Sequence, residues 1–381
     1  MDLSDDPGPS TQQARASPRR LTYIDAVRGM AILSMLTLHL AEPALLTRAT
    51  HQLLVIDGAH GFVVLAGFVL GLVESRRTQR GEPLSVTRRA ARKRILLLVV
   101  GHWCVVTLIV LGNAVAGRHS LLTPEFADQS VIRQLADMLT FREMPDNVNI
   151  LPMYVVFLAL AALVYAPLLR AGRVVPVIVI SAALYTVSHL GHGLTWFLAP
   201  FAPLAWQALF TAGMVTGWLS TEARQLRRRT HPWSLIAAIT FMLIPAVLAR
   251  RHVRSYFSGQ LGSTIDSLID KFQLGFLNLL GGLGLVLTLG VLVGGIEQRG
   301  MFPRAMRWLS LLGRRSLACY LTISVLAWLT HLLPSSVLRQ GPGDVVILVG
   351  VGVTTLVALI RDGRLQLRRR MGLVADPAPA G

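Results

Sequence analysis

Apolar runs of bilayer length recur along nearly the whole chain, and this pattern most constrains its fold. A helix needs about 20 predominantly apolar residues to cross the hydrocarbon core. Ten such runs lie near residues 24–46, 57–74, 95–116, 150–169, 174–190, 200–219, 233–249, 269–294, 315–333 and 344–360. Only helices and closed barrels satisfy their backbone hydrogen bonds inside lipid. The sequence therefore predicts an all-α, polytopic transmembrane helical bundle of about ten spans.

The charged residues are few and mark topology. Only 15% of the 381 residues are charged and 53% are apolar, whereas a soluble domain carries about 25% charged residues. The net charge is +17, but the arginines lie in short clusters at alternate breaks between the apolar runs, as they do in cytoplasmic loops. We therefore expect both termini in the cytoplasm and no nucleic-acid partner. The expected parts are a disordered cytoplasmic tail at 1–20, a transmembrane domain at 21–362 and a basic cytoplasmic tail at 363–381.

Three ionisable residues lie on one side of the first apolar run. Arg28 and His39 are eleven residues apart, which brings them to nearly the same helix azimuth, about 16 Å apart along the axis. Asp25 shares the face of Arg28. A charged group at mid-membrane costs roughly 2.5–3.5 kcal/mol, so such residues usually face a protein interior or a wet cavity. The alternative is that Asp25 and Arg28 form an ion pair at the helix start and that His39 bonds a neighbouring carbonyl.

The residue types on this face favour group-transfer chemistry. Imidazole can act as base and acid near neutral pH, so His39 could take a proton from an acceptor hydroxyl. Arg28 could hold an anionic group, such as a phosphate or carboxylate, of a donor that enters from the cytosol. The sequence predicts His39, Arg28 and Asp25 as catalytic residues, with Asp25 orienting Arg28.

The eighth run brings a second polar group to the outer side. Asp270 and Lys271 are expected to open this span from outside, at a depth comparable to that of His39, and Asn278 would share a helix face with Lys271. The chain has only one other lysine, Lys93. Lys271 could bind an acceptor hydroxyl or the charged tail of an acyl group. Equally, it could be a solvated helix-end cation paired with Asp270.

Two further features have ordinary explanations beside the functional ones. His60 and Asp57, at the outer end of the second run, could line the same cavity as His39 or be interfacial residues. The basic segment at 76–94 predicts a cytoplasmic hairpin, which by itself indicates topology and binding of anionic lipid. The sequence contains neither a phosphate-binding loop nor a His/Cys/carboxylate cluster at metal-ligand spacing, so no metal is expected.

Five short motifs are spread from residue 21 to about 331. The first is DAVRG at 25–29 with its Arg-x10-His spacing; the others are FVVLAGF at 62–68, ILPMY at 150–154, IDKFQLG at 269–275 and LGRRSL at 312–317. Their order and spacing resemble those of the OpgC family, where the last four read FxxLSGF, ILPLY, DKxxL and LGRxSL. This family lies within the membrane acyltransferase superfamily called acyltransferase family three.

The resemblance implies an acyl-CoA-dependent O-acyltransferase. The OpgC family is typified by the succinyltransferase of periplasmic glucans. The acyl group is therefore expected to be succinyl or acetyl, and the acceptor a hydroxyl of an extracytoplasmic glycan or lipid-linked sugar. Acyl-CoA would be a co-substrate, with no permanently bound cofactor. The resemblance assigns the phosphates of coenzyme A to Arg89, Arg92 and Arg94. The residues expected to bind substrate are Lys271, Asp270, Asn278, His60 and Tyr154.

The chain departs from the family pattern in three places. Ala66 stands where the family tends to have Ser, and Arg315 stands where His or Asn is commoner. In the turns after Lys271 the family usually has Arg and His, whereas this chain has Asn278 and no His. These departures bear on the identity of the acceptor more than on the reaction type.

We therefore expect a multi-pass enzyme of a bacterial inner (plasma) membrane, with acyl-CoA, a glycan or lipid-linked sugar and membrane lipids as partners. The main alternative is a transporter or flippase that uses the same intramembrane charges as a substrate or proton path. A third reading is a scaffold whose charges are structural.

Overall fold

The computed structural model describes residues 22–51, 56–115, 130–142, 148–190, 202–220, 232–250, 253 and 255–370. Every regular element within these ranges is helical, which confirms the predicted all-α class. The predicted tail at 1–20 and residues 371–381 lie outside the described residues. The last helix, α17 (Pro342–Arg370), continues through the predicted boundary at 362.

The helices follow the apolar runs, and each of the ten predicted runs contains one. The first half of the chain forms α1 (Thr22–Leu40), α2 (Leu45–Thr50), α3 (Gly58–Gln79), α4 (Leu84–Val115), α5 (Val131–Leu139), α6 (Ile150–Leu160), the π-helix η2 (Ala161–Tyr165), α7 (Ala166–Arg170) and α8 (Val174–Leu190). The second half forms α9 (Pro203–Leu219), α11 (Pro232–Leu248), α13 (Gly259–Ile269), α14 (Phe276–Gln298), α15 (Pro303–Arg314), α16 (Ser316–His331), the short helix η3 (Ser335–Leu338) and α17.

Several of these helices are long and apolar enough to cross a bilayer. Five qualify by length and composition: Gly58–Gln79, Leu84–Val115, Ile150–Arg170, Phe276–Gln298 and Pro342–Leu365. Together, α15 and α16 would make a sixth span, bent by 81°. Helices α8 and α11 are apolar but shorter. The chain is therefore a multi-pass membrane protein, while the count of ten spans and the cytoplasmic placement of both termini stay predictions.

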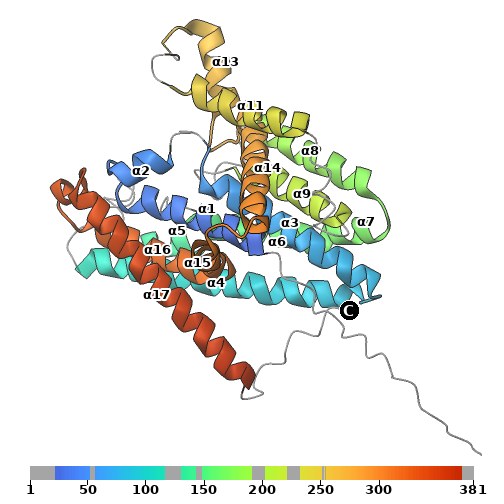
Figure 1. Ribbon diagram of the computed structural model, residues 1–381, viewed down its shortest axis with the longest axis horizontal. Helices are drawn as coiled ribbons and strands as arrows, with labels where there is room; N and C mark the ends of the chain where they lie inside the picture. Colours follow the sequence, from blue (N-terminus) through green and yellow to red (C-terminus); the bar gives the residue numbers. More distant parts are fainter. Residues whose placement is uncertain are drawn as a thin grey trace, which may run out of the picture.

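The central helices approach one another at glycines. A Cβ at Gly67 of α3 would overlap the backbone of Phe210 in α9, and one at Gly213 of α9 would overlap the backbone of Val64 in α3. Small residues permit this close approach in membranes, where packing replaces the hydrophobic effect as the force between helices. In Figure 1, α1 and α3 cross the middle of the molecule, α4 runs along one edge, and α11 and α13 lie at the opposite edge.

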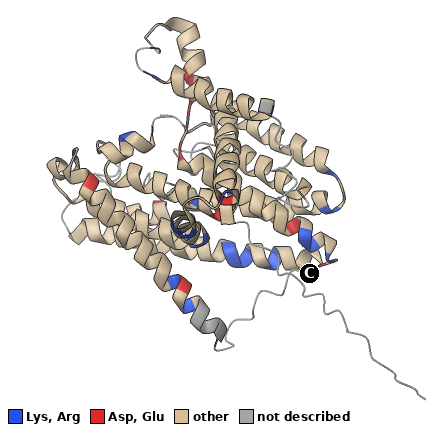
Figure 2. Ribbon diagram, viewed as in Figure 1, with Lys and Arg blue, Asp and Glu red and all other residues tan. Residues whose placement is uncertain are grey.

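One group of basic residues lies near the end of α3 and the start of α4 (Figure 2). This is the hairpin predicted at 76–94, and Gly81 at its tip has φ +67°. Glycine adopts this left-handed conformation without the steric cost that a Cβ brings. The turn therefore returns the chain so that α4 can run beside the core.

Candidate active site

A cavity of about 300 Å³ lies among α1, α3, α4, α6, α9 and α16. Most of its lining is apolar. We call it the inner cavity, because the basic α3–α4 hairpin, predicted to be cytoplasmic, supplies part of its wall. Its polar lining residues are Arg28, Glu74, Arg77, Thr87, Arg94, Tyr154 and Tyr320.

Arg28 reaches the inner cavity from α1. Its Nη2 donates a hydrogen bond of 2.8 Å to Ser316 Oγ, and its Nη1 lies 3.9 Å from Asp25 Oδ1. The guanidinium also stands over the ring of Phe62, 5.7 Å from the centroid. The Arg28 and Asp25 side chains are only 15% and 14% exposed. A fixed, partly desolvated guanidinium in an apolar cavity is suited to hold an anionic or strongly polarised ligand group.

Tyr154 lines the same cavity from α6. Its hydroxyl donates to the carbonyl oxygen of Phe62 over 2.9 Å, and its ring meets the Phe62 ring edge-on at 5.5 Å between centroids. The hydroxyl proton is therefore engaged with α3, while the oxygen keeps its capacity to accept. The structure thus places the predicted substrate residue Tyr154 beside Arg28.

Glu74 fixes the hairpin side of the cavity. Its Oε2 accepts from Thr87 Oγ1 at 2.6 Å, and its Oε1 accepts from Arg170 Nε at 2.6 Å. Arg77 Nη1 lies 3.7 Å from Oε2. Because Thr87 belongs to α4 and Arg170 to α7, this buried carboxylate ties three helices together.

The predicted coenzyme A arginines divide into two groups. Arg94 lines the inner cavity. Arg89 and Arg92 lie on the exposed side of α4 and are not part of the cavity lining. They could meet only the part of a ligand that extends beyond the cavity along the hairpin.

His39 lies in the last turn of α1 and is half-buried. No hydrogen bond to His39 is found within the described part of the chain, so the alternative in which it bonds a neighbouring carbonyl receives no support there. Lys271, Asp57, His51 and His331 lie close enough to act on it electrostatically. We call His39, His51, Asp57, His60 and Lys271 the outer cluster.

The prediction that Asp270 and Lys271 open the eighth span is wrong. Helix α13 ends at Ile269, residues 270–275 form a turn, and α14 begins at Phe276. The backbone N–H of Gln273 donates to Asp270 Oδ1 at 2.7 Å. The backbone N–H of Gly275 donates to the carbonyl oxygen of Asp270 at 2.8 Å. Local bonds of this kind compete with helix formation. Lys271 therefore lies outside the helix that carries Asn278, and the two do not share a helix face.

Asn278 and the neighbouring helices hold the 270–275 turn in place. Asn278 Nδ2 donates to the carbonyl of Ile269 at 3.0 Å. Tyr185 of α8 donates to the carbonyl of Leu274 at 2.8 Å, and Trp206 of α9 donates to that of Phe272 at 3.2 Å. Leu274 itself has φ +51°, a conformation that a non-glycine residue keeps only when its surroundings impose it. These contacts from three helices thus hold the turn in a defined conformation on the outer side.

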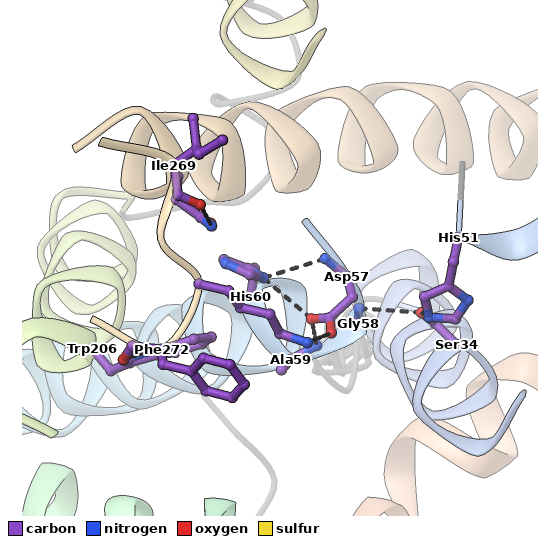
Figure 3. A network of polar contacts seen from close by, with 11 residues as sticks. Ser34, His51, Asp57, Gly58, Ala59, His60, Trp206, Ile269 and Phe272 are labelled. Carbon is purple, nitrogen blue, oxygen red and sulfur yellow. Dashed lines mark hydrogen bonds and ion pairs between the residues drawn. The ribbon is translucent and has the colours of Figure 1, made fainter. Parts of the chain in front are cut away.

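Lys271 pairs with Asp57 and not with Asp270. Its Nζ donates to Asp57 Oδ2 at 2.5 Å, while Asp57 Oδ1 lies 3.2 Å from His60 Nδ1. The His60 ring is completely buried and packs at 4.8 Å between centroids against Trp206. Figure 3 shows Asp57 between His60 on one side and Ser34 with His51 on the other. His60 is therefore part of the wall behind the cluster.

The two ends of α1 contribute residues to two separate sites. Arg28 lines the inner cavity, whose lining does not include His39, and the two residues are separated by about 16 Å of helix rise. The structure thus brings Arg28, Arg94 and Tyr154 together, and separately brings His39 near Asp57 and Lys271. It does not join them in one described cavity.

A family comparison decides what kind of protein carries this arrangement. The family model described as OpgC protein matches residues 19–364. The chain belongs to the OpgC family. Membership implies a membrane acyltransferase of the glucan-succinylating type. No curated protein and no solved structure was found to match the chain.

Sequence reasoning missed several residues of this OpgC protein's site. Ser316, which holds Arg28, lies within the recognised LGRRSL motif but received no role. Ser34 Oγ bonds His51 Nε2 at 3.2 Å, and burial lowers the pKa of His51 while the nearby carboxylate of Asp57 opposes that change. Histidines at the outer ends of apolar runs were the available signal. Within the described ranges, no group of three or more His, Cys, Asp or Glu is arranged to hold a metal ion.

Proposed function

We propose that this OpgC-family protein is an integral membrane O-acyltransferase that moves a succinyl or acetyl group from cytosolic acyl-CoA to a hydroxyl of an extracytoplasmic glycan or lipid-linked sugar. The observation that carries the proposal is the placement of two groups on α1. One is a partly buried guanidinium in a cavity beside the basic hairpin, and the other is an imidazole in the outer cluster. Family membership over residues 19–364 supplies the reaction class.

In this mechanism the acceptor hydroxyl attacks the thioester carbonyl while His39 takes its proton. The C–S bond then breaks, and the proton passes from His39 to the coenzyme A thiolate. Imidazole suits both steps near neutral pH.

Arg28 is assigned to the donor. About 16 Å of helix rise separates it from His39, so a short acyl group cannot touch both while both keep their observed positions. Asp25 orients Arg28, Tyr154 adds an acceptor oxygen to the donor cavity, and Arg94 lies at its basic wall. Arg89 and Arg92 would meet coenzyme A phosphates farther along the hairpin.

The acceptor side is assigned to the outer cluster. Lys271, held by Asp57, supplies a fixed positive charge near His39. Asp270 and Asn278 shape the turn that presents Lys271. His60 supports the cluster from behind. The inner membrane of a bacterium provides both compartments that this reaction requires.

The test uses purified protein in proteoliposomes with radiolabelled succinyl-CoA or acetyl-CoA and a glucan acceptor. Release of free coenzyme A should match the appearance of a labelled ester on the glucan, as detected by mass spectrometry. A transporter would instead move glucan without consuming the thioester. His39→Ala should reduce turnover by a factor of at least about 100, within the usual contribution of general base catalysis.

The matched control is His189→Ala. His189 lies exposed on α8 and bonds the carbonyl of Tyr185 one turn earlier in its own helix at 2.9 Å. Its loss should leave turnover unchanged. Undiminished turnover in His39→Ala protein would refute the assignment of the base, and absence of ester formation by the unaltered protein would refute the reaction.

A further inference from the structure

The carboxylate of Asp57 joins the parts of the outer cluster. Asp57 is the N-cap residue of α3 and is 7% exposed. Its Oδ1 accepts the backbone N–H of Ala59 at 2.9 Å and lies 3.2 Å from His60 Nδ1. Its Oδ2 accepts from Lys271 Nζ at 2.5 Å. One buried side chain therefore connects the start of α3 with the 270–275 turn.

The same segment is linked to α1. The backbone N–H of Gly58 donates to Ser34 Oγ at 3.2 Å, and Ser34 Oγ bonds His51 at 3.2 Å. Figure 3 shows this chain of contacts running from His51 through Ser34 and Gly58 to Asp57. Asp57 thus lies where α1, α3 and the turn meet.

His60 presents an unused nitrogen to the interior. His60 Nδ1 lies 3.2 Å from Asp57 Oδ1 and also accepts the backbone N–H of Asp57 at 3.3 Å in the capping box of α3. Its Nε2 is buried and has no hydrogen-bond partner within the described residues. Gly282 of α14 provides the room, since a Cβ there would come to 3.0 Å from His60 Cδ2. A buried polar nitrogen without a partner is costly, so we expect water or a substrate hydroxyl to reach it.

Asp57 and Lys271 both act electrostatically on His39. They are opposite in sign and are joined by an ion pair, so each opposes the effect of the other at His39. Loss of the carboxylate alone would leave an ammonium group without a counter-charge close to the imidazole. An uncompensated positive charge opposes the uptake of a proton by a neighbouring base.

We propose that Asp57 is a positioning residue of the acceptor side, which holds Lys271 and His60 in place and offsets the charge of Lys271 beside His39. This proposal rests on the proposed function, in which His39 receives the proton of the acceptor hydroxyl. Asp57 itself touches neither substrate. Lys271 is correspondingly a fixed element of the site and not a free ligand for the acceptor.

The first experiment compares Asp57→Asn, Lys271→Met and the double variant. Asparagine remains a good N-cap residue, so the start of α3 is retained. Asp57→Asn should lower kcat by about tenfold or more while KM for acyl-CoA changes by less than about twofold. The kcat of the double variant should be at least about threefold higher than that of Asp57→Asn, because the uncompensated ammonium is gone.

A purely structural role would also allow the double variant to recover, because removing both partners of a buried pair is often close to neutral, but the melting temperature would then fall and recover together with kcat. Melting temperatures that follow kcat across the three variants would overturn the proposal, and so would wild-type kcat in Asp57→Asn. A matching rise in KM for acyl-CoA would also count against it, since the effect would then extend to the inner cavity.

The second experiment does not depend on activity. Lys93 and Lys271 are the only lysines, and Lys93 is exposed, so it serves as an internal reference for labelling with an amine-acylating reagent. Peptide mass spectrometry should show slow labelling of Lys271 in the unaltered protein and labelling at least about fivefold faster in Asp57→Asn, because the ammonium loses its partner.

Asp344→Asn is the matched control for this labelling. Asp344 also accepts backbone N–H groups, from Leu46 at 2.8 Å and Gly341 at 3.1 Å, so its change tests the loss of a capping carboxylate elsewhere. It should leave Lys271 labelling unchanged. Equal rates of Lys271 labelling in the unaltered and Asp57→Asn proteins would refute the ion pair between Lys271 and Asp57, and with it the proposal. The expected labelling without any ester formation would instead refute the proposed function alone.

Discussion

The ion pair between Glu74 and Arg170 offers a sharp test of how the inner cavity is built. The Glu74 side chain is 1% exposed and that of Arg170 is 15% exposed. Replacing Glu74 by Leu leaves a guanidinium unpaired in a largely dry position, and breaking a buried pair from one side costs about 3–5 kcal/mol. With an unfolding entropy of about 2.1 cal/mol/K per residue, the 381 residues give about 0.8 kcal/mol/K. The melting temperature should therefore fall by about 4–6 °C.

The assay follows intrinsic tryptophan fluorescence during heating of the detergent-solubilised protein. Glu74→Leu combined with Arg170→Met should recover most of the loss, because apolar replacement of both partners of a buried pair is often close to neutral. Arg133→Met is the control: its side chain is 68% exposed and lies 3.8 Å from Asp137, and such pairs contribute only about 0–1 kcal/mol. A Glu74→Leu shift no larger than that of the control would refute the reasoning, as would a double variant no more stable than Glu74→Leu.

Two further predictions concern the central helices. Ser316→Ala removes the 2.8 Å hydrogen bond to Arg28, and a hydrogen bond to a charged group is worth about 1.5–3 kcal/mol. The KM for acyl-CoA should therefore rise by about tenfold or more. Ser316→Thr keeps the hydroxyl oxygen and should keep most of the affinity. Unchanged steady-state kinetics in Ser316→Ala would disprove this role. Gly67→Val should prevent stable packing, because its Cβ would overlap the backbone of Phe210; size-exclusion chromatography should show aggregated protein, and a monodisperse, active variant would contradict the close contact.

The helices could be predicted because the lipid environment imposes one simple rule. Every apolar run had to become a helix, and each of the ten contains one. The stripe on the first run also predicted a real contact, since Asp25 and Arg28 lie three residues apart and approach each other at 3.9 Å. Periodicity is informative where partners belong to the same helix.

The turn at 270–275 could not be predicted in this way. Hydropathy carries the eighth run through it, because Phe272 and Leu274 are apolar. The helix is interrupted by a hydrogen bond from the backbone N–H of Gln273 to the side chain of Asp270, together with hydrogen bonds from α8 and α9 to carbonyls of the turn. The Lys271–Asp57 pair joins residues 214 positions apart, and no local pattern indicates such a partner.

The close packing of α1 and α3 limits how this protein can work. Arg28 and His39 belong to α1, and Asp57 and His60 belong to the start of α3. A Cβ at Gly313 of α15 would overlap the α1 backbone at Asp25. In the same way, the absence of a Cβ at Gly67 lets the α3 backbone contact that of α9. Helices in backbone contact are poorly able to slide, because packed interiors resist small displacements. The separation along α1 is therefore a fixed feature, and a thioester that enters beside Arg28 must itself extend toward the outer cluster for its carbonyl to meet His39.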